Sequence, residues 1–328
     1  MKAISSLIFA MLALAACTAD KEPGGTLELE RNTEFDGAAL RFFVKLDDGA
    51  EASVHTDDDL VGNTRAPTPM RGHRAHALTF FKETEAGTSV AHALLSWDPE
   101  NPADYLAFGW WTQFPDQHAP DLSFAESEQY AIIDGPEIDH GIVPQVPVDG
   151  AASYTGQAGG LYAYTFGSDW GEDEGEFVID EYQGVLTLTA DFADGTVRGC
   201  IGCVGDLVTR RAHFGAFLGR EPIDAQGLAR DYELHLASAI LREDGLFERD
   251  RVTVRHPERT ITSFEGGWGG ALSSRQDTDG NPRLVAGFSS VGFEESDGSE
   301  GDFWGSLLGL SDTFLQDGQS SPLPDGDH

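Results

Sequence analysis

The segment Gly184–Cys203 constrains the fold more than any other part of the chain, because its pattern is that of a β-hairpin with one apolar face. From Leu186 to Phe192, apolar residues alternate with threonine and aspartate, which is the period of a half-buried strand. Asp194-Gly195 follows, and glycine tolerates the positive φ that tight turns need. Similar runs recur toward the C-terminus, and helical periodicity is scarce throughout. The sequence therefore predicts an all-β protein.

A linker rich in Pro and Gly, residues 144–150, divides the chain into two domains. The N-terminal domain, residues 26–148, is predicted to be β-rich, with a loop over Asp57–Pro69. The C-terminal domain, residues 149–314, shows about eight short strands with regular turn signals, which predicts a water-soluble, antiparallel up-and-down barrel. Polar residues such as His235 fall on the face opposite the apolar one. Residues 315–328 are expected to form a disordered acidic tail. In the N-terminal domain, strands are expected over residues 39–46, 75–81, 89–97 and 105–114. In the C-terminal domain, one strand is expected over residues 207–218.

The first residues indicate export and lipid attachment. The apolar run Ile4–Ala16 is too short to span a bilayer and has the form of a secretory signal. Its Leu-Ala-Ala-Cys ending resembles a bacterial lipoprotein box, in which Cys17 is lipidated; the alternative is a plain signal with an accidental cysteine. We expect a signal peptide over residues 1–16, a tether over 17–25, and attachment to the outer membrane.

The acidic composition argues against one large class of function. The chain of 328 residues has a formal net charge of −35, which opposes nucleic-acid binding because that binding depends on neutralising phosphates. The charge favours solubility and repels an anionic membrane surface. A saline habitat or a basic partner would each account for it.

Cys200 and Cys203 are the only cysteines besides Cys17, and a lone pair in an exported protein is most simply a disulfide. In an extended strand their Cα atoms would lie roughly 10 Å apart, beyond bridging distance. A bridge therefore requires a turn at Ile201-Gly202, for which glycine is well suited. A zinc site would need two further ligands, and none lies nearby in the sequence. We expect a structural disulfide and no metal site.

Four segments occur in a recognisable order, Ser153–Ala158, Ala190–Gly199, Ala239–Phe247 and Gly266–Phe288. Together they resemble the barrel domain of transferrin-binding protein B and its relatives, the surface lipoproteins that include factor H-binding protein. Asp104–Trp111 is similar to a "handle" subdomain of bacterial transferrin-binding-like solute-binding proteins. The resemblance implies a non-enzymatic, outer-membrane-anchored binding protein. It does not imply transferrin, because this chain is one handle-plus-barrel unit and the transferrin binders have two lobes.

Two groups in the N-terminal domain are candidate ligand-binding residues. The basic cluster consists of Arg71, His73, Arg74 and His76. These side chains could capture a carboxylate or a haem propionate; the alternative is an exposed loop that enters a strand. Trp110 and Trp111 could line a ligand pocket, or they could belong to a core or a handle–barrel contact.

Catalytic signatures are absent from the sequence. Gly305–Gly309 has a superficial likeness to a nucleophile elbow, but its spacing is wrong, so the last barrel strand is expected there. Asp277–Asn281 has the form of half a calcium loop, but its twelfth position is Phe288 rather than Glu. We therefore expect no enzyme and no cofactor.

The expected function is binding of a protein or an iron-related nutrient through loops, at the cell surface or on the periplasmic face. The alternatives are a structural envelope lipoprotein and a haem-type carrier.

Overall fold

The computed structural model describes residues 33–46, 49–66, 70, 72–119, 122, 127–138, 143–173, 175–211, 229–249 and 251–316. The described part of the chain is nearly all β, with 63% of those residues in strands and 5% in helices, so the predicted fold class is confirmed. The predicted signal peptide, the lipidation site Cys17 and the tether lie outside the described residues, as do residues 317–328 of the predicted tail.

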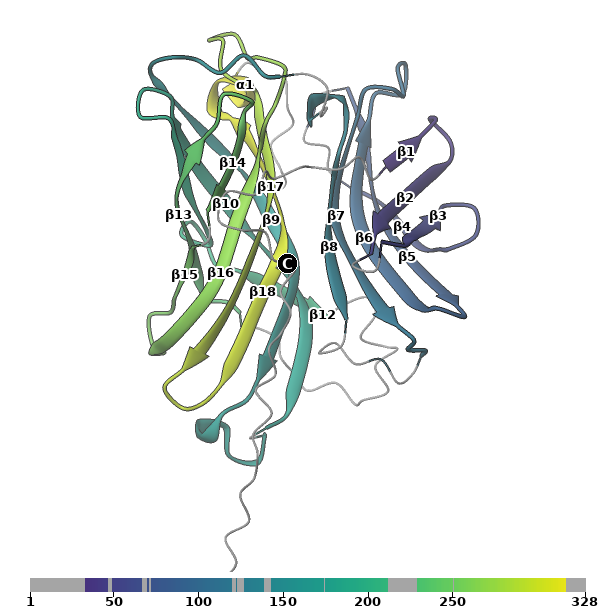
Figure 1. Cartoon of the computed structure of the whole chain (residues 1–328), viewed down its shortest axis with the longest axis vertical. Coiled ribbons are helices and arrows are strands. Elements are labelled where there is room, and N and C mark those ends of the chain that lie inside the picture. The colour runs from purple at the N-terminus through teal and green to yellow at the C-terminus, as the bar shows by residue number, and fades with distance from the viewer. Residues whose placement is uncertain are drawn as a thin grey trace, which may run out of the picture.

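The C-terminal domain is a closed eight-stranded antiparallel β-barrel, drawn on the left of Figure 1. Its strands are β9 (Ala151–Thr165), β10 (Phe177–Asp191), β11 (Thr196–Ile201), β12 (Val208–Arg211), β13 (Glu233–Leu241), β14 (Leu246–Arg249), β15 (Val252–Arg255), β16 (Ile261–Leu272), β17 (Leu284–Glu295) and β18 (Glu300–Ser311). β18 pairs with β9, and β11 pairs with β13, so the ring has no free edge. β14 and β15 succeed each other along β13, and β11 and β12 along β10, so each pair fills one strand position.

Large side chains fill the barrel, because every second residue of each strand points inward. Tyr162, Tyr232 and Phe303 are fully enclosed. The ring centroids of Tyr162 and Phe303 lie 4.6 Å apart, and those of Tyr232 and Phe303 lie 5.5 Å apart. Aromatic packing of this kind stabilises a core beyond simple area burial. The apolar face of the hairpin that opened the sequence analysis contributes Leu186 and Leu188 to the same cluster.

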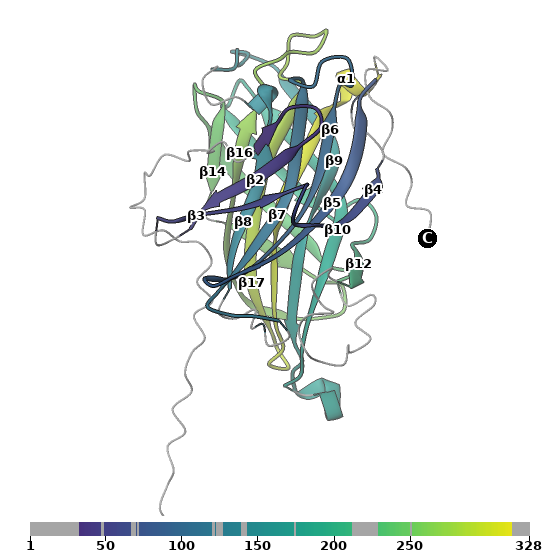
Figure 2. The same ribbon diagram turned by 90° about the vertical axis from the view of Figure 1, so that its right-hand side faces the viewer.

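The N-terminal domain, here called the handle, consists of two stacked sheets. Its strands are β1 (Thr33–Phe35), β2 (Leu40–Lys45), β3 (Glu51–His55), β4 (Leu60–Arg65), β5 (Arg74–Thr84), β6 (Gly87–Trp97), β7 (Tyr105–Pro115) and β8 (Glu128–Asp134). Strands β4–β8 form a sheet in chain order, and the shorter strands β1–β3 cross one face of it (Figure 2). Phe42, Phe80 and Trp111 are buried between the two sheets.

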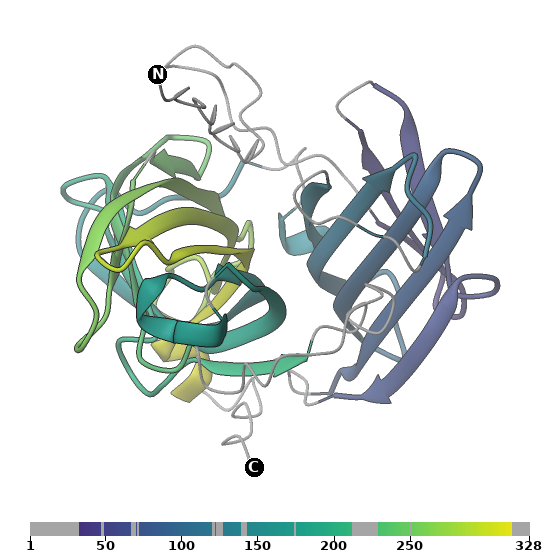
Figure 3. The same ribbon diagram turned by 90° about the horizontal axis from the view of Figure 1, so that it is seen from below.

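The other face of the β4–β8 sheet packs against the barrel (Figure 3). Apolar side chains from both domains form two clusters there. In one cluster Trp110 of β7 meets Leu161 of β9 and Trp304 of β18. In the other, Leu106 of β7 meets Leu308 of β18. The sheet of the handle therefore has two buried faces, and the handle and the barrel share a continuous apolar contact.

Three sequence expectations need correction. The predicted loop Asp57–Pro69 contains β4, an edge strand that the prediction missed because its side chains are mostly exposed on both faces and show no apolar alternation. The strand predicted over residues 207–218 is β12, which ends at Arg211; residues 212–228 lie outside the described part. Residues 315–316 belong to a short helix, α1 (Asp312–Gln316), rather than to the tail.

The helices that the structure describes are short segments. Besides α1, the described residues contain the 3-10 helices η2 (Pro136–Ile138) and η3 (Ser168–Asp173). None of the helices in the described part of the chain has the length and apolar character needed to cross a membrane.

Candidate functional site

The side chains of the predicted basic cluster lie in different environments. His73 is buried, with its Nε2 atom 3.8 Å from Asp104 and its Nδ1 atom 3.4 Å from the Ser96 hydroxyl. Burial lowers the pKa of His73, and the Asp104 carboxylate partly opposes this shift. Arg74 is exposed on β5. Arg71 lies outside the described residues.

His76, the last member of the cluster, has its own partners within the handle. Its Nδ1 atom lies 2.5 Å from the Asn63 side-chain oxygen, and its ring centroid lies 5.3 Å from that of Trp97. The described histidines of the cluster are thus held by contacts inside the handle. Capture of an anion by this cluster stays a prediction.

Trp110 and Trp111 point to opposite faces of β7, as neighbours on a strand must. Trp110 is buried in the handle–barrel contact, and Trp111 is buried in the core of the handle. Both positions correspond to the alternative given in the sequence analysis, a core or interdomain contact.

The predicted disulfide between Cys200 and Cys203 is confirmed, with a Cα–Cα distance of 5.9 Å. The chain turns sharply at Gly202, whose φ is +80°, a conformation that favours glycine. The bond therefore closes the turn that leaves β11, as the spacing of the two cysteines predicted. Cys200 is buried and Cys203 is exposed.

His235 of β13 lies beside this disulfide and Glu233 of the same strand contacts His235; sequence reasoning missed both. His235 stands opposite Cys200 in the ladder between β11 and β13. Its Nε2 atom lies 3.8 Å from the Sγ atom of Cys203 and 2.8 Å from an oxygen of Glu233. The sequence analysis treated His235 as an ordinary outward-facing barrel residue. The proximity of His235 to the disulfide depends on how β11 pairs with β13. Residues 202–232 separate these two strands, so the spacing of residues in the sequence does not determine their register.

A β-bulge next to His235 hollows the outer face of the barrel. Between the ladder pairs at Val197 and Gly199, β13 contains one residue more than β11. The buried indole of Trp268 donates a hydrogen bond of 2.8 Å to the carbonyl oxygen of Ala237, which holds the bulge from inside the barrel. A Cβ atom at Gly199 would collide with the carbonyl oxygen of Thr187, so glycine is needed at this close approach.

The depression at this bulge, here called the outer groove, has a volume of about 520 Å³. It is lined by Thr187, Thr189, Arg198, Gly199, His235, Leu236, Ala237, Ser238 and Thr253. Its strands β13 and β15 lie on the side of the barrel away from the handle (Figure 1). Hydroxyl groups and the Arg198 guanidinium can donate hydrogen bonds to a ligand, and a guanidinium pairs well with carboxylate or phosphate. The groove can therefore hold a polar ligand that carries an anionic group.

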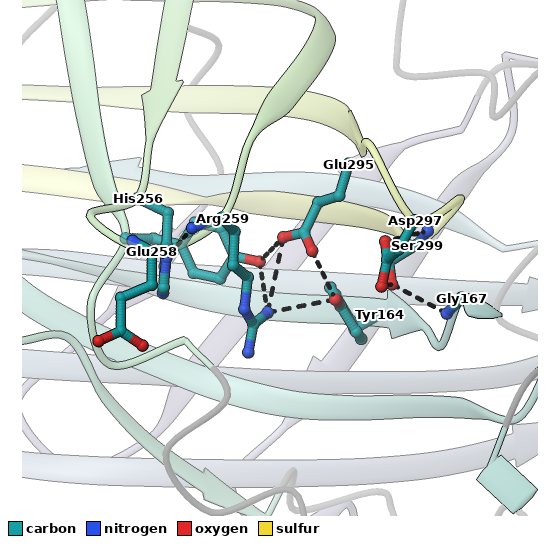
Figure 4. A network of polar contacts seen from close by, with 9 residues as sticks. Tyr164, Gly167, His256, Glu258, Arg259, Glu295, Asp297 and Ser299 are labelled. Atoms are coloured by element: carbon teal, nitrogen blue, oxygen red, sulfur yellow. Dashed lines mark hydrogen bonds and ion pairs between the residues drawn. The ribbon is translucent and has the colours of Figure 1, made fainter. Parts of the chain in front are cut away.

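A second polar cluster, here called the barrel-end network, lies inside the barrel (Figure 4). It consists of Tyr164, Tyr232, Arg259 and Glu295. The Tyr164 hydroxyl donates to Glu295 at 3.0 Å, and the Arg259 guanidinium lies 3.5 Å from the same carboxylate. Tyr232 also bonds to Glu295, and Arg259 donates to the Tyr232 hydroxyl at 2.8 Å. Burial raises the pKa of both tyrosines, so each phenol stays protonated and can donate.

The loop that carries Arg259 is itself ordered by a side chain. The Nδ1 atom of His256 accepts backbone hydrogen bonds from Glu258 at 3.1 Å and from Arg259 at 3.0 Å. Because Arg259 and Glu295 balance each other in charge and are bridged by the two phenols, the network favours a structural role. It closes one end of the barrel.

The half calcium loop is a polar turn between β16 and β17. One carboxylate oxygen of Asp277 accepts hydrogen bonds from the backbone of Asp279 at 3.0 Å and of Asn281 at 2.9 Å. Its other oxygen accepts a 2.7 Å bond from Ser311. Gly305–Gly309 likewise lies within β18, the last barrel strand.

Comparison with known proteins assigns this chain to no family. The chain matches no protein-family model, and no curated protein is significantly similar to it. The functional conclusion therefore depends on the residues and the geometry described above.

Proposed function

We propose that this chain is a non-catalytic binding protein of the bacterial envelope that holds its ligand in the outer groove. The ligand would be polar and would carry a carboxylate or phosphate group, either as a small molecule or as part of a protein. This proposal narrows the expectation of loop-mediated binding that came from the resemblance to transferrin-binding protein B. It moves the candidate site from the handle to the barrel.

One observation carries the proposal, the position of Arg198 in a groove lined by hydroxyl groups on an otherwise acidic molecule. The chain has a formal net charge of −35, so the Arg198 guanidinium that lines this depression offers a positive charge on a predominantly acidic molecule. The barrel interior, by contrast, is occupied by its own aromatic side chains. The bulge gives the groove a fixed shape, because the Trp268 hydrogen bond supports it from the core.

Attachment to the outer membrane through Cys17 is part of the same proposal. The Leu-Ala-Ala-Cys ending of the first apolar run supports it. Anchoring at one end and a groove on the face away from the handle would suit capture of a ligand near the membrane. Cys17→Ala should move the protein from the membrane fraction to the soluble fraction. Unchanged sedimentation with membranes would contradict the anchor.

The binding proposal is tested with a charge reversal in the groove. The Arg198→Glu chain and the wild-type chain are immobilised and exposed to an envelope extract, and retained components are quantified at increasing load. We expect a saturable component that carries an anionic group to bind the wild type and to be lost from Arg198→Glu. Arg249→Glu is the matched control, because Arg249 is an exposed arginine on β14 that does not line the groove.

Two results would reject the binding proposal. Equal retention by Arg198→Glu and Arg249→Glu would remove the groove as the site. Absence of any saturable component would favour the alternative, a structural envelope lipoprotein whose barrel serves no specific ligand. Far-UV circular dichroism of each variant checks that the barrel is intact.

A further inference from the structure

The disulfide at the edge of the outer groove is part of a cluster of metal-ligating side chains. The Sγ atoms of Cys200 and Cys203 and a ring nitrogen of His235 all lie within 4.8 Å of one another. Glu233 adds a carboxylate oxygen 2.8 Å from Nε2 of His235. Cys200 lies in β11 and Cys203 in the turn that follows it, whereas His235 and Glu233 belong to β13. The ladder between the two strands places His235 opposite Cys200.

The two cysteines and His235 supply three of the four ligands of a tetrahedral zinc site. Cysteine pairs with the Cys-x-x-Cys spacing provide two of the ligands in many zinc sites, and histidine and carboxylate complete such sets. With Zn–S bonds of about 2.3 Å and Zn–N bonds of about 2.0 Å, a sulfur and a nitrogen on one tetrahedral ion lie about 3.5 Å apart. The observed distance from Nε2 of His235 to Sγ of Cys203 is 3.8 Å.

The site is open to both a reductant and an ion. Cys203 is exposed, and the side chain of His235 is 31% exposed. Once the S–S bond is broken, rotation of the exposed Cys203 side chain can separate the two sulfurs to the spacing of metal ligands. The Nε2 atom of His235 would exchange its contact with Glu233 for the ion, and the Glu233 carboxylate beside it would turn to the ion as the fourth ligand.

We propose that the Cys200–Cys203 disulfide is the oxidised form of a binding site for Zn²⁺ made by Cys200, Cys203, His235 and Glu233. A dithiol reductant would supply two electrons and two protons, and would itself become a disulfide while the two protein thiols form. Zn²⁺ would then displace both thiol protons and bind the two thiolates. The oxidised chain would not bind the ion at this place, because neither sulfur of a disulfide carries the negative charge of a thiolate.

Cobalt titration of the full chain tests the proposal, since Co²⁺ occupies zinc sites and reports tetrahedral thiolate ligation by its absorption. Cys17→Ala is included in every protein, so that Cys200 and Cys203 are the only thiols. After reduction with a phosphine and its removal without oxygen, we expect about one equivalent of Co²⁺ to give a thiolate charge-transfer band and intense visible bands. Zn²⁺ should abolish both by competition. The oxidised protein should show neither.

Variants assign the ligands. His235→Ala should weaken Co²⁺ binding by at least about tenfold, which is the loss that even outer-shell partners of metal sites produce. Cys203→Ser should remove the charge-transfer band contributed by its sulfur. His118→Ala is the matched control, because His118 is an exposed histidine on the handle. Circular dichroism of the reduced proteins shows whether each barrel is folded.

Two outcomes would overturn the proposal. One is the absence of a Co²⁺ spectrum in the folded, reduced chain. The other is unchanged affinity in His235→Ala, which would mean that the cysteines bind the ion without the neighbouring strand. Retention of the groove ligand is measured on oxidised protein, so failure of the metal site and failure of the groove remain distinguishable.

Discussion

Asp302 on β18 is a carboxyl group whose environment makes stability depend on pH. Burial raises its pKa from 3.8 to about 6, and the neighbouring Glu300 carboxylate adds to the rise. A pKa that is higher in the folded state than in the unfolded state means that the folded chain holds this proton more tightly. The contribution of the group to stability is therefore greatest below about pH 4, and it is lost as the pH rises toward 6.

We expect Asp302→Asn to remove this loss. Relative to the wild type, the variant should gain up to about 3 kcal/mol in free energy of unfolding between pH 4 and pH 7, a bound set by the size of the pKa shift. Urea denaturation at a series of pH values measures the difference. Asp194→Asn, in the exposed turn after β10, is the control and should show no such trend. A pH-independent difference for Asp302→Asn would contradict the burial argument.

Single residues also show where sequence reasoning reaches its limit. The Cys200–Cys203 bridge and the turn at Gly202 could be predicted, because both depend on atoms close in sequence. The neighbourhood of His235 could not, because it depends on the register between β11 and β13, and the bulge shifts that register. The same holds for Glu295, whose partners are Tyr164 of β9 and Tyr232, the residue before β13.

The turn after β11 is held both by the Cys200–Cys203 disulfide and by the pairing of β11 with β13. Because the disulfide closes a loop of very few residues, little chain entropy is removed from the unfolded state, and reduction should cost about 2 kcal/mol. Urea denaturation with and without reductant measures this cost, in metal-free buffer. The double variant Cys200→Ala/Cys203→Ala should be insensitive to the reductant. A cost near zero in the wild type would show that the ladder with β13 alone fixes the turn.

Strands that bury one face and expose the other could be predicted from the sequence, because their apolar and polar residues alternate. The barrel strands were found because apolar and polar residues alternate along them, as along β10. β4 was missed because neither face is apolar, and its place in the sheet depends on pairing with β5. β7 was found, but its apolar run did not reveal that it is buried on both faces, with Trp110 and Trp111 in different cores.

The contact between handle and barrel combines apolar packing with an ion pair of the buried Glu137. Glu137, in η2 of the handle, is 1% exposed, and its carboxylate accepts a 2.8 Å hydrogen bond from Arg283 of the barrel. Ser273 of the barrel donates to the same carboxylate at 3.0 Å. Beside this pair, Arg275 of the barrel binds Asp104 of the handle at 2.8 Å. These polar contacts fix the orientation of the handle relative to the barrel, because hydrogen bonds are directional and apolar contacts are not.

Removal of Glu137 should therefore weaken the whole molecule. Glu137→Ala leaves the largely enclosed Arg283 side chain, which is 17% exposed, without its carboxylate. We expect a loss of about 3 kcal/mol in free energy of unfolding, because a poorly solvated charge without its partner is costly. Adding Arg283→Ala should recover part of the loss, since it removes that charge. Asp206→Ala, which breaks an ion pair with Arg230 whose side chains are 54% and 65% exposed, should cost far less than Glu137→Ala, because water screens exposed ion pairs. Urea unfolding followed by tryptophan fluorescence measures all three. Equal losses for Glu137→Ala and Asp206→Ala would mean that the ion pair does not hold the handle to the barrel.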